Sequence, residues 1–146
     1  MTNEIARTKE WFELAVPQPT DKNRLVQMGV HFEEISEMFT ALGADPVATA
    51  LSDLATVFKS GSTPTGQPVV FSDLTIDRKE LLDALCDQIV TATGVAHMLG
   101  MDIVTALARV NDSNWSKFVD GKPEFDANGK ISKSANYRKP DLDGLY

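Results

Sequence analysis

Apolar residues recur at alternating steps of three and four along much of the chain, the spacing that places side chains on one side of an α-helix. Thr20 precedes the clearest run and belongs to the residue types that cap helix N-termini, whereas Gly43 follows it and belongs to those that end helices. The pattern predicts a long helix between these two residues. Its apolar stripe comprises Leu25, Met28, Phe32, Ile35, Phe39 and Leu42.

Two more helices are predicted on either side of this one. A first helix over residues 3–15 ends before Pro17, because proline cannot continue a helix. A third helix begins at Asp45-Pro46, with Asp45 as the cap, and ends near Gly61. The residues that follow, up to Ser72, contain several prolines and glycines and are expected to form a loop.

The helical pattern returns after this loop in a fourth and a fifth segment. Asp77 is expected to cap the fourth helix and Gly100 to end it, while Asp102 caps a fifth helix that runs to about Phe118. The lone cysteine, Cys86, falls within the fourth helix, and we interpret it as a small core residue. The other residues of this helix that we expect to be buried are Leu81, Leu82, Leu85, Ile89, Ala92, Ala96 and Leu99.

Helical segments with few convincing strands predict an all-α fold, a four- to five-helix bundle. Residues 119–146 differ from the rest, because they contain Asp120-Gly121 and Asn128-Gly129, which favour tight turns, and show no helical pattern. We therefore expect a helical part over residues 1–118 and an irregular tail over residues 119–146 that belongs to the same domain.

The composition excludes some classes of protein. A chain of 146 residues with a formal net charge of -7 is unsuited to duplex nucleic acid, which requires a basic face. No apolar run approaches the length of a membrane span, and no signal peptide opens the chain. We expect a cytoplasmic protein that does not contact a membrane.

Carboxylates cluster on two of the predicted helices. Residues three and four apart share one helical face. Two such faces brought together would bind hard divalent cations through oxygen, and magnesium also needs a phosphate-bearing partner to complete its shell. For each cluster, a merely solvated helix face is the alternative. The clusters are Glu33, Glu34 and Glu37 in the second helix and Glu80, Asp83 and Asp87 in the fourth.

A di-iron carboxylate bundle is the competing kind of metal site. It would require Glu-x-x-His pairs on two helices. His31 stands before Glu34, in the reverse order, and His97 lies far from the acids in the sequence. The histidines therefore do not favour di-iron, and we interpret His31 as a structural side chain.

Polar and basic residues follow the second acidic cluster. Asn111, Asn114 and Lys117 are spaced to share a face of the fifth helix and could contact a phosphate and a base, although a polar helix end is an alternative. Cations beside an acidic metal site suit a polyphosphate, whereas a flexible solubilising tail is the alternative. The cations of the tail are Lys122, Lys130, Lys133, Arg138 and Lys139.

With these motifs the chain resembles the MazG-like, all-α nucleoside triphosphate pyrophosphohydrolases, a superfamily that includes phosphoribosyl-ATP pyrophosphohydrolase. The family signature is E-E-x-x-E on one helix and E-x-x-D on the next, matched here by Glu33-Glu34-x-x-Glu37 and Glu80-x-x-Asp83. The tail, from Asn114-Trp115-Ser116-Lys117 to Asn136-Tyr137, looks like that of phage-type members. One departure is the longer gap between the acidic motifs, residues 38–79.

The resemblance implies an enzyme that hydrolyses a (deoxy)nucleoside triphosphate, dGTP being one candidate, to the monophosphate and pyrophosphate. By the family pattern, Glu33 would orient or deprotonate the attacking water in a catalytic domain over residues 1–118. Mg²⁺ or Mn²⁺ would be held by Glu34, Glu37, Glu80 and Asp83. The substrate would contact Asn111, Asn114, Lys117, Lys130, Lys133, Asn136 and Tyr137.

Members of this family are dimers or tetramers, so the resemblance also implies a homodimer or a homotetramer. A hypothesis from a different class is a non-catalytic helical dimer that acts as a regulator or scaffold and whose acidic faces are only solvated.

Overall fold

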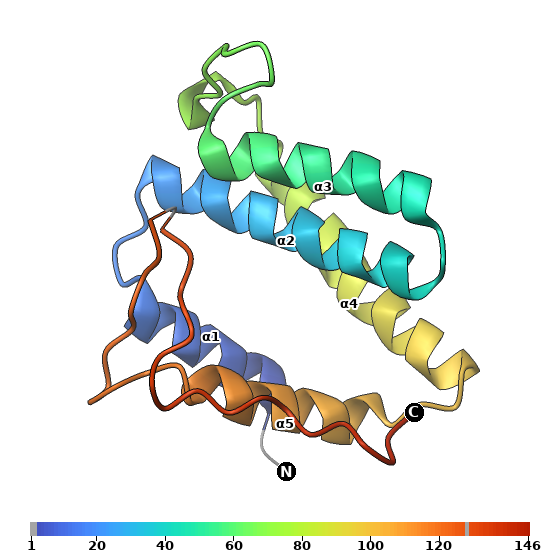
Figure 1. Ribbon diagram of the computed structural model, residues 1–146. Coiled ribbons are helices and arrows are strands. Elements are labelled where there is room, and N and C mark those ends of the chain that lie inside the picture. The colour runs from blue at the N-terminus through green and yellow to red at the C-terminus, as the bar shows by residue number, and fades with distance from the viewer. Residues whose placement is uncertain (1–2, 128) are drawn as a thin grey trace. The chain divides into compact units, whose positions relative to one another are not determined.

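The computed structural model describes residues 3–127 and 129–146, and its helices confirm the all-α class (Figure 1). No strand forms among these residues, which contain only isolated β-bridges. The α-helices are α1 (Glu4–Ala15), α2 (Asp21–Ala41), α3 (Asp45–Ser60), α4 (Arg78–Met98) and α5 (Ile103–Trp115), and a short 3₁₀ turn, η1, spans Phe71–Asp73.

Three of the predicted N-caps are confirmed. Thr20 Oγ1 accepts from the Asn23 amide at 3.2 Å, and the Asn23 side chain accepts from the Thr20 amide at 3.0 Å, which closes a capping box at the start of α2. Asp77 and Asp102 cap α4 and α5 through their carboxylates. Each cap satisfies backbone N–H groups that have no partner inside the helix.

Two helix ends differ from the prediction. Asp45 is the first residue of α3, and Ala44 occupies the cap position without a side-chain hydrogen bond. Helix α5 ends at Trp115, before the predicted Phe118, because the chain there turns through Ser116. Both errors are local, since propensity does not fix the last turn of a helix.

The described chain divides into two compact units. The α2–α3 unit comprises Gln18–Leu74 and Phe125–Ser132. The α1–α4–α5 unit comprises the residues up to Pro17 together with Thr75–Glu124 and Lys133–Tyr146. The grouping of residues 1–118 and 119–146 into one domain stays a prediction.

Helices α2 and α3 lie side by side as an antiparallel hairpin (Figure 1). They approach closely at Gly29, where a Cβ atom would lie only 2.7 Å from the carbonyl oxygen of Ala55. Ser36 Oγ, also buried, donates to the carbonyl oxygen of Ala48 at 2.7 Å. Small residues on one side of α2 thus let α3 cover the side of the helix that also carries Glu33.

Helices α1 and α5 pack together through aromatic and polar contacts in the other unit. The ring of Trp11 stacks on Phe118 at 5.5 Å, and its Nε1 donates to the carbonyl oxygen of Asn114 at 2.9 Å. The C-terminal segment runs along α5 (Figure 1), where Arg109 Nη1 donates to the carbonyl oxygen of Asp141 at 2.8 Å. The tail is therefore fixed to α5 by hydrogen bonds, although it has no helix of its own.

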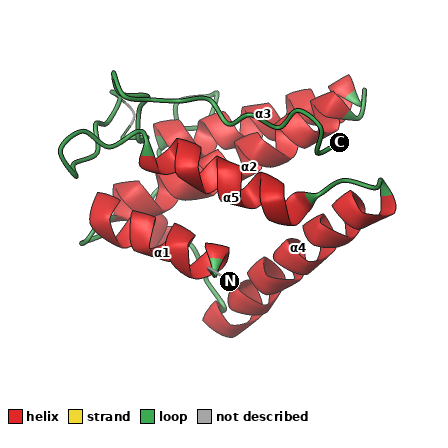
Figure 2. Cartoon of the chain, turned by 90° about the horizontal axis from the view of Figure 1, so that it is seen from below, coloured by secondary structure: helices red, strands yellow, loops and turns green. Residues whose placement is uncertain are grey.

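Helix α4 is exposed, which overturns the prediction that its apolar residues are buried within the chain. Helices α4 and α5 meet at the turn that contains Gly100, and α4 points away from α5 with increasing distance from that turn (Figure 2). Leu82 and Val90 are 63% and 67% exposed, and Cys86 is exposed as well. Among the residues expected in the core, Ala96 is buried, but the following are exposed: Leu81, Leu82, Leu85, Ile89, Ala92 and Leu99.

None of the helices in the described part of the chain combines the length and the apolar character that crossing a membrane requires.

Candidate functional site

Glu33 lies at the centre of a charged cluster in the α2–α3 unit. Its Oε1 accepts from Lys59 Nζ of α3 at 2.8 Å, and its Oε2 accepts from Lys130 Nζ at 2.8 Å. All three side chains are half-buried. We call these three residues the Glu33 cluster. Both carboxylate oxygens of Glu33 are thus engaged by ammonium groups.

These ion pairs shift the pKa values of the Glu33 cluster. The hydrogen bonds from Lys130 and from Lys59 lower the pKa of Glu33, against the opposing effect of its burial. For Lys130, burial acts to lower the pKa, but the hydrogen bond to Glu33 and the charges of Glu33, Glu34 and Glu37 outweigh it and raise the pKa. Glu33 is consequently held as a carboxylate and Lys130 as an ammonium.

The whole first acidic motif therefore acts on Lys130. Glu34 and Glu37 are exposed on α2, yet their charges contribute to the raised pKa of this lysine. Carboxylates that share a helical face repel one another unless a cation lies nearby. In the described structure, Lys130 and Lys59 supply that positive charge.

A short turn of the tail presents Lys130. An isolated bridge joins Phe125 to Ile131, and the Asp126 amide donates to the carbonyl oxygen of Lys130 at 2.9 Å. Gly129 adopts a φ of +82°, in the left-handed region that glycine tolerates. Gly129 therefore turns as the sequence indicates, whereas Asn128, its predicted turn partner, lies outside the described residues.

The second acidic motif lies on α4, in the other unit. Glu80 and Asp83 are exposed near the start of this helix, and Asp87 is exposed one turn further on. The predicted four-carboxylate ligand set is thus divided, with one pair in each unit. Carboxylate oxygens suit Mg²⁺ or Mn²⁺, but no group of three or more His, Cys, Asp or Glu side chains in the described chain is arranged to hold a metal ion. The residue types therefore suit Mg²⁺ or Mn²⁺, but the described structure does not bring them together into a metal site.

The three polar residues predicted on α5 contribute to the packing of α1. Asn111 is only 2% exposed; its Oδ1 accepts from Thr8 Oγ1 at 2.9 Å, and its Nδ2 donates to Glu4 Oε2 at 2.7 Å. Asn114 offers its carbonyl oxygen to Trp11, and Lys117 Nζ lies 5.9 Å from the centre of the Trp11 ring. Their role in substrate binding stays a prediction.

The remaining predicted substrate residues follow α5 in the tail. Lys133 Nζ lies 5.0 Å from the centre of the Tyr137 ring, and the amide of Asn136 donates to Ser134 Oγ at 3.1 Å. These residues belong to the α1–α4–α5 unit, whereas Lys130 belongs to the α2–α3 unit. Each unit therefore holds some of the predicted substrate contacts.

Sequence reasoning did not single out Lys59. It stands in the last turn of α3, where a lysine is explained by the helix dipole alone. Its partner, Glu33, is 26 positions away, so no local spacing connects the two. The available signal was indirect: Gly29 and Ser36 flank Glu33 on α2, and small residues of this kind allow a second helix to approach.

No family model, no curated protein and no solved structure matches this chain. The resemblance to the pyrophosphohydrolases thus depends on the acidic motifs, the tail and their helical settings.

Proposed function

We propose that the chain is a nucleoside triphosphate pyrophosphohydrolase, which cleaves a (deoxy)nucleoside triphosphate to the monophosphate and pyrophosphate. The observation that supports this proposal most is the first acidic motif with its two lysines. A metal–triphosphate complex presents a cation and anionic oxygens together, so a site for it needs carboxylates and ammonium groups side by side. Here Glu34 and Glu37 supply the carboxylates, and Lys59 and Lys130 supply the ammonium groups.

Within this proposal, Glu33 is better suited to orient than to deprotonate. Its pKa is lowered by the hydrogen bonds from Lys130 and Lys59, and a weaker base removes a proton from water less effectively. As a positioning residue it would hold the two ammonium groups toward the outer phosphates. The base role implied by the resemblance stays a prediction.

Glu34, Glu37, Glu80 and Asp83 would hold Mg²⁺ or Mn²⁺ when the two acidic faces are brought together. A bound metal ion of this kind lowers the pKa of water and neutralises charge on the reacting phosphate. The proposal does not specify the base and the sugar of the substrate, for which dGTP is one candidate.

Self-association completes the proposal, as a homodimer or homotetramer in which α4 contacts a second copy. Leu82 and Val90 are largely exposed, and further apolar residues, such as Leu85 and Ile89, are exposed on the same helix. An isolated helix with so much apolar surface is expected to be covered in the working protein. A second copy of the chain is the simplest occupant, since it is always present at the same concentration.

The proposal is tested by pyrophosphate release from each of the common ribo- and deoxyribonucleoside triphosphates, with Mg²⁺ or Mn²⁺. Glu37→Gln and Asp83→Asn should each lower turnover by at least about a hundred-fold, the order expected when a group that stabilises the reacting phosphate is lost. Glu10→Gln, at an exposed glutamate of α1, is the matched control and should keep wild-type turnover.

Wild-type turnover in Glu37→Gln and Asp83→Asn would refute the assignment. In ¹⁸O-labelled water the label should enter the monophosphate, and orthophosphate as product would exclude attack at the α-phosphorus. The non-catalytic regulator is distinguished by a melting experiment: an enzyme of this class should gain stability with metal plus nucleotide, and a plain scaffold should not.

A further inference from the structure

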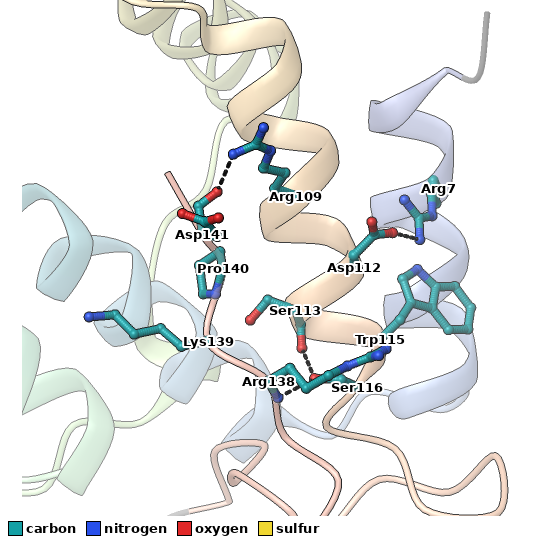
Figure 3. A pocket seen from close by; sticks show the side chains of 10 residues that line it. All are labelled: Arg7, Arg109, Asp112, Ser113, Trp115, Ser116, Arg138, Lys139, Pro140 and Asp141. Carbon is teal, nitrogen blue, oxygen red and sulfur yellow. Dashed lines mark hydrogen bonds and ion pairs between the residues drawn. The ribbon is translucent and has the colours of Figure 1, made fainter. Parts of the chain in front are cut away.

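An open pocket of about 570 Å³ lies within the α1–α4–α5 unit and contains none of the residues of the Glu33 cluster (Figure 3). Helices α1 and α5 form one wall, and the C-terminal segment forms the other. Its volume lies in the range of ~300–1,000 Å³ that is usual for small-molecule sites. The charged side chains that line it are Arg7, Arg109, Arg138, Lys139, Asp112 and Asp141.

The pocket carries more positive than negative charge, in a chain whose net charge is -7. Arg7 is compensated, because its guanidinium contacts Asp112 and lies 3.5 Å from Glu4. Arg109 donates to the carbonyl oxygen of Asp141, an acceptor that carries no full charge.

Arg138 and Lys139 follow on the opposite wall, and Figure 3 shows the Lys139 side chain extending away from α5. Neither forms an ion pair with a residue that the structure describes. The Asp141 carboxylate accepts from the amide of Asp143 at 3.0 Å, so this acid is already engaged within the tail. An anion in the pocket would therefore meet excess positive charge.

Buried serines hold the wall that carries Arg138. Ser116 Oγ accepts from the Arg138 amide at 2.8 Å and donates to the carbonyl oxygen of Ser113 at 2.7 Å. Figure 3 shows the Arg138 side chain extending toward Trp115, whose indole Nε1 is buried without a hydrogen-bond partner among the described residues. The backbone of Arg138 is thus fixed to α5, whereas its guanidinium forms no ion pair with a described residue.

We propose that this pocket binds the phosphate dianion of a small molecule, either inorganic phosphate or the phosphate of a nucleoside monophosphate. Guanidinium groups form paired hydrogen bonds with phosphate oxygens, and such charge-assisted bonds are stronger than neutral ones. Arg109 and Arg138 are the lining guanidinium groups that no ion pair with a described residue compensates. The site is distinct from the Glu33 cluster and does not depend on the proposed hydrolysis.

The test is calorimetric titration of the full chain with inorganic phosphate and, separately, with adenosine monophosphate, at constant ionic strength and with a chelator. Saturable binding should be seen, and Arg138→Gln should weaken it at least about ten-fold, as expected for one lost charge-assisted hydrogen bond. Arg109→Gln should weaken it as well. Tighter binding of the nucleotide than of phosphate would identify an organic ligand, and equal binding would identify free phosphate.

Arg78→Gln, at an exposed arginine of α4, removes the same charge elsewhere and should leave binding unchanged. Lys130→Gln tests whether the ligand occupies the Glu33 cluster instead. The inference is overturned if no saturable binding occurs, if Arg78→Gln weakens binding as much as Arg138→Gln does, or if only Lys130→Gln weakens it. Since the chelator removes divalent metal, failure of the proposed hydrolysis would not affect this result.

Discussion

Replacement of Gly29 by alanine tests how closely α2 and α3 approach. A Cβ atom at this position would lie 2.6 Å from Lys59 Cγ, 2.7 Å from the carbonyl oxygen of Ala55 and 2.9 Å from the amide nitrogen of Lys59. The lysine methylene can move, but the two backbone atoms move only with α3. Gly29→Ala therefore forces the helices apart, and it also displaces Lys59 from Glu33.

Two effects of opposite sign determine how much Gly29→Ala changes the free energy of unfolding. Alanine favours a helix over glycine by about 1 kcal/mol. Overpacking typically costs about 1–3 kcal/mol, and the upper part of that range applies where backbone must shift. We expect Gly29→Ala to lower the free energy of unfolding by about 1–2 kcal/mol, which corresponds to a fall in Tm of roughly 2–8 °C for a chain of this length.

Gly94→Ala, on α4, is the matched control. No atom of the described chain outside its own helical surroundings lies within 4 Å of a Cβ at residue 94. This variant should therefore gain up to about 1 kcal/mol from helix propensity alone. Urea unfolding followed by far-UV circular dichroism measures both variants. If Gly29→Ala is as stable as the wild type, the close contact of α2 and α3 is refuted. A loss of stability in Gly94→Ala would show that α4 is covered at this residue.

Two more predictions concern the Glu33 cluster and α4. Because the folded pKa of Glu33 is lowered, its stabilising effect is present above its unfolded value of about 4.3 and is lost as the pH falls through the folded pKa. The stability difference between wild type and Glu33→Gln should therefore shrink on acidification from about pH 6 to about pH 3 in urea titrations; a difference that does not change with pH would contradict the ion pairs. Sedimentation velocity should show at least about ten-fold weaker self-association when Leu82 and Val90 are both changed to glutamine, since each removes roughly 1.5–3 kcal/mol of apolar burial. Leu14→Gln, at an exposed leucine of α1, is the control, and unchanged association of the double variant would exclude α4 as the interface.

The sequence predicts the helices well because their limits are set by neighbouring residues. Thr20, Asp77 and Asp102 each cap a helix through an amide only two or three positions away. Glycines at 43, 61 and 100 adopt the positive φ that ends α2, α3 and α4. Asp45 shows the limit of this reasoning. An aspartate followed by a proline suits the cap position and the first helical position equally well, and Asp45 occupies the first helical position.

The contacts between elements could not be predicted in this way. The apolar stripe of α2 identifies a covered side, and Phe32 of this stripe does contact Phe58 of α3 at 5.3 Å between ring centres. The stripe does not indicate that α3 also lies against Gly29 and Ser36. The ion pairs of Glu33 join residues 26 and 97 positions apart, which no periodic pattern encodes. In α4 the spacing of the apolar residues indicates that one side of the helix needs to be buried. The spacing does not indicate which other surface buries that side. Under the proposed self-association, a second copy of the chain would supply that surface.

The exposure of α4 also bears on the proposed metal site, because the acidic and apolar residues of α4 belong to one rigid helix. At a rise of about 1.5 Å per residue, fixing Leu82 or Val90 against a second copy fixes the positions of Glu80 and Asp83 as well. Glu33 on α2 is already compensated by two lysines, whereas Glu80 and Asp83 form no ion pair with a described residue. Association that brings the α4 acids near other carboxylates is unfavourable unless a cation is bound there.

By linkage, the cation and the second copy would then strengthen each other's binding by the same factor. Loss of association in the Leu82 and Val90 double variant is for this reason expected to weaken metal binding too, although neither leucine nor valine can ligate a metal. Titration with Mn²⁺ at a chain concentration where the wild type is associated measures this coupling. Equal Mn²⁺ affinity in the wild type and in a dissociated double variant would show that the α4 acids bind metal, if at all, without a second copy.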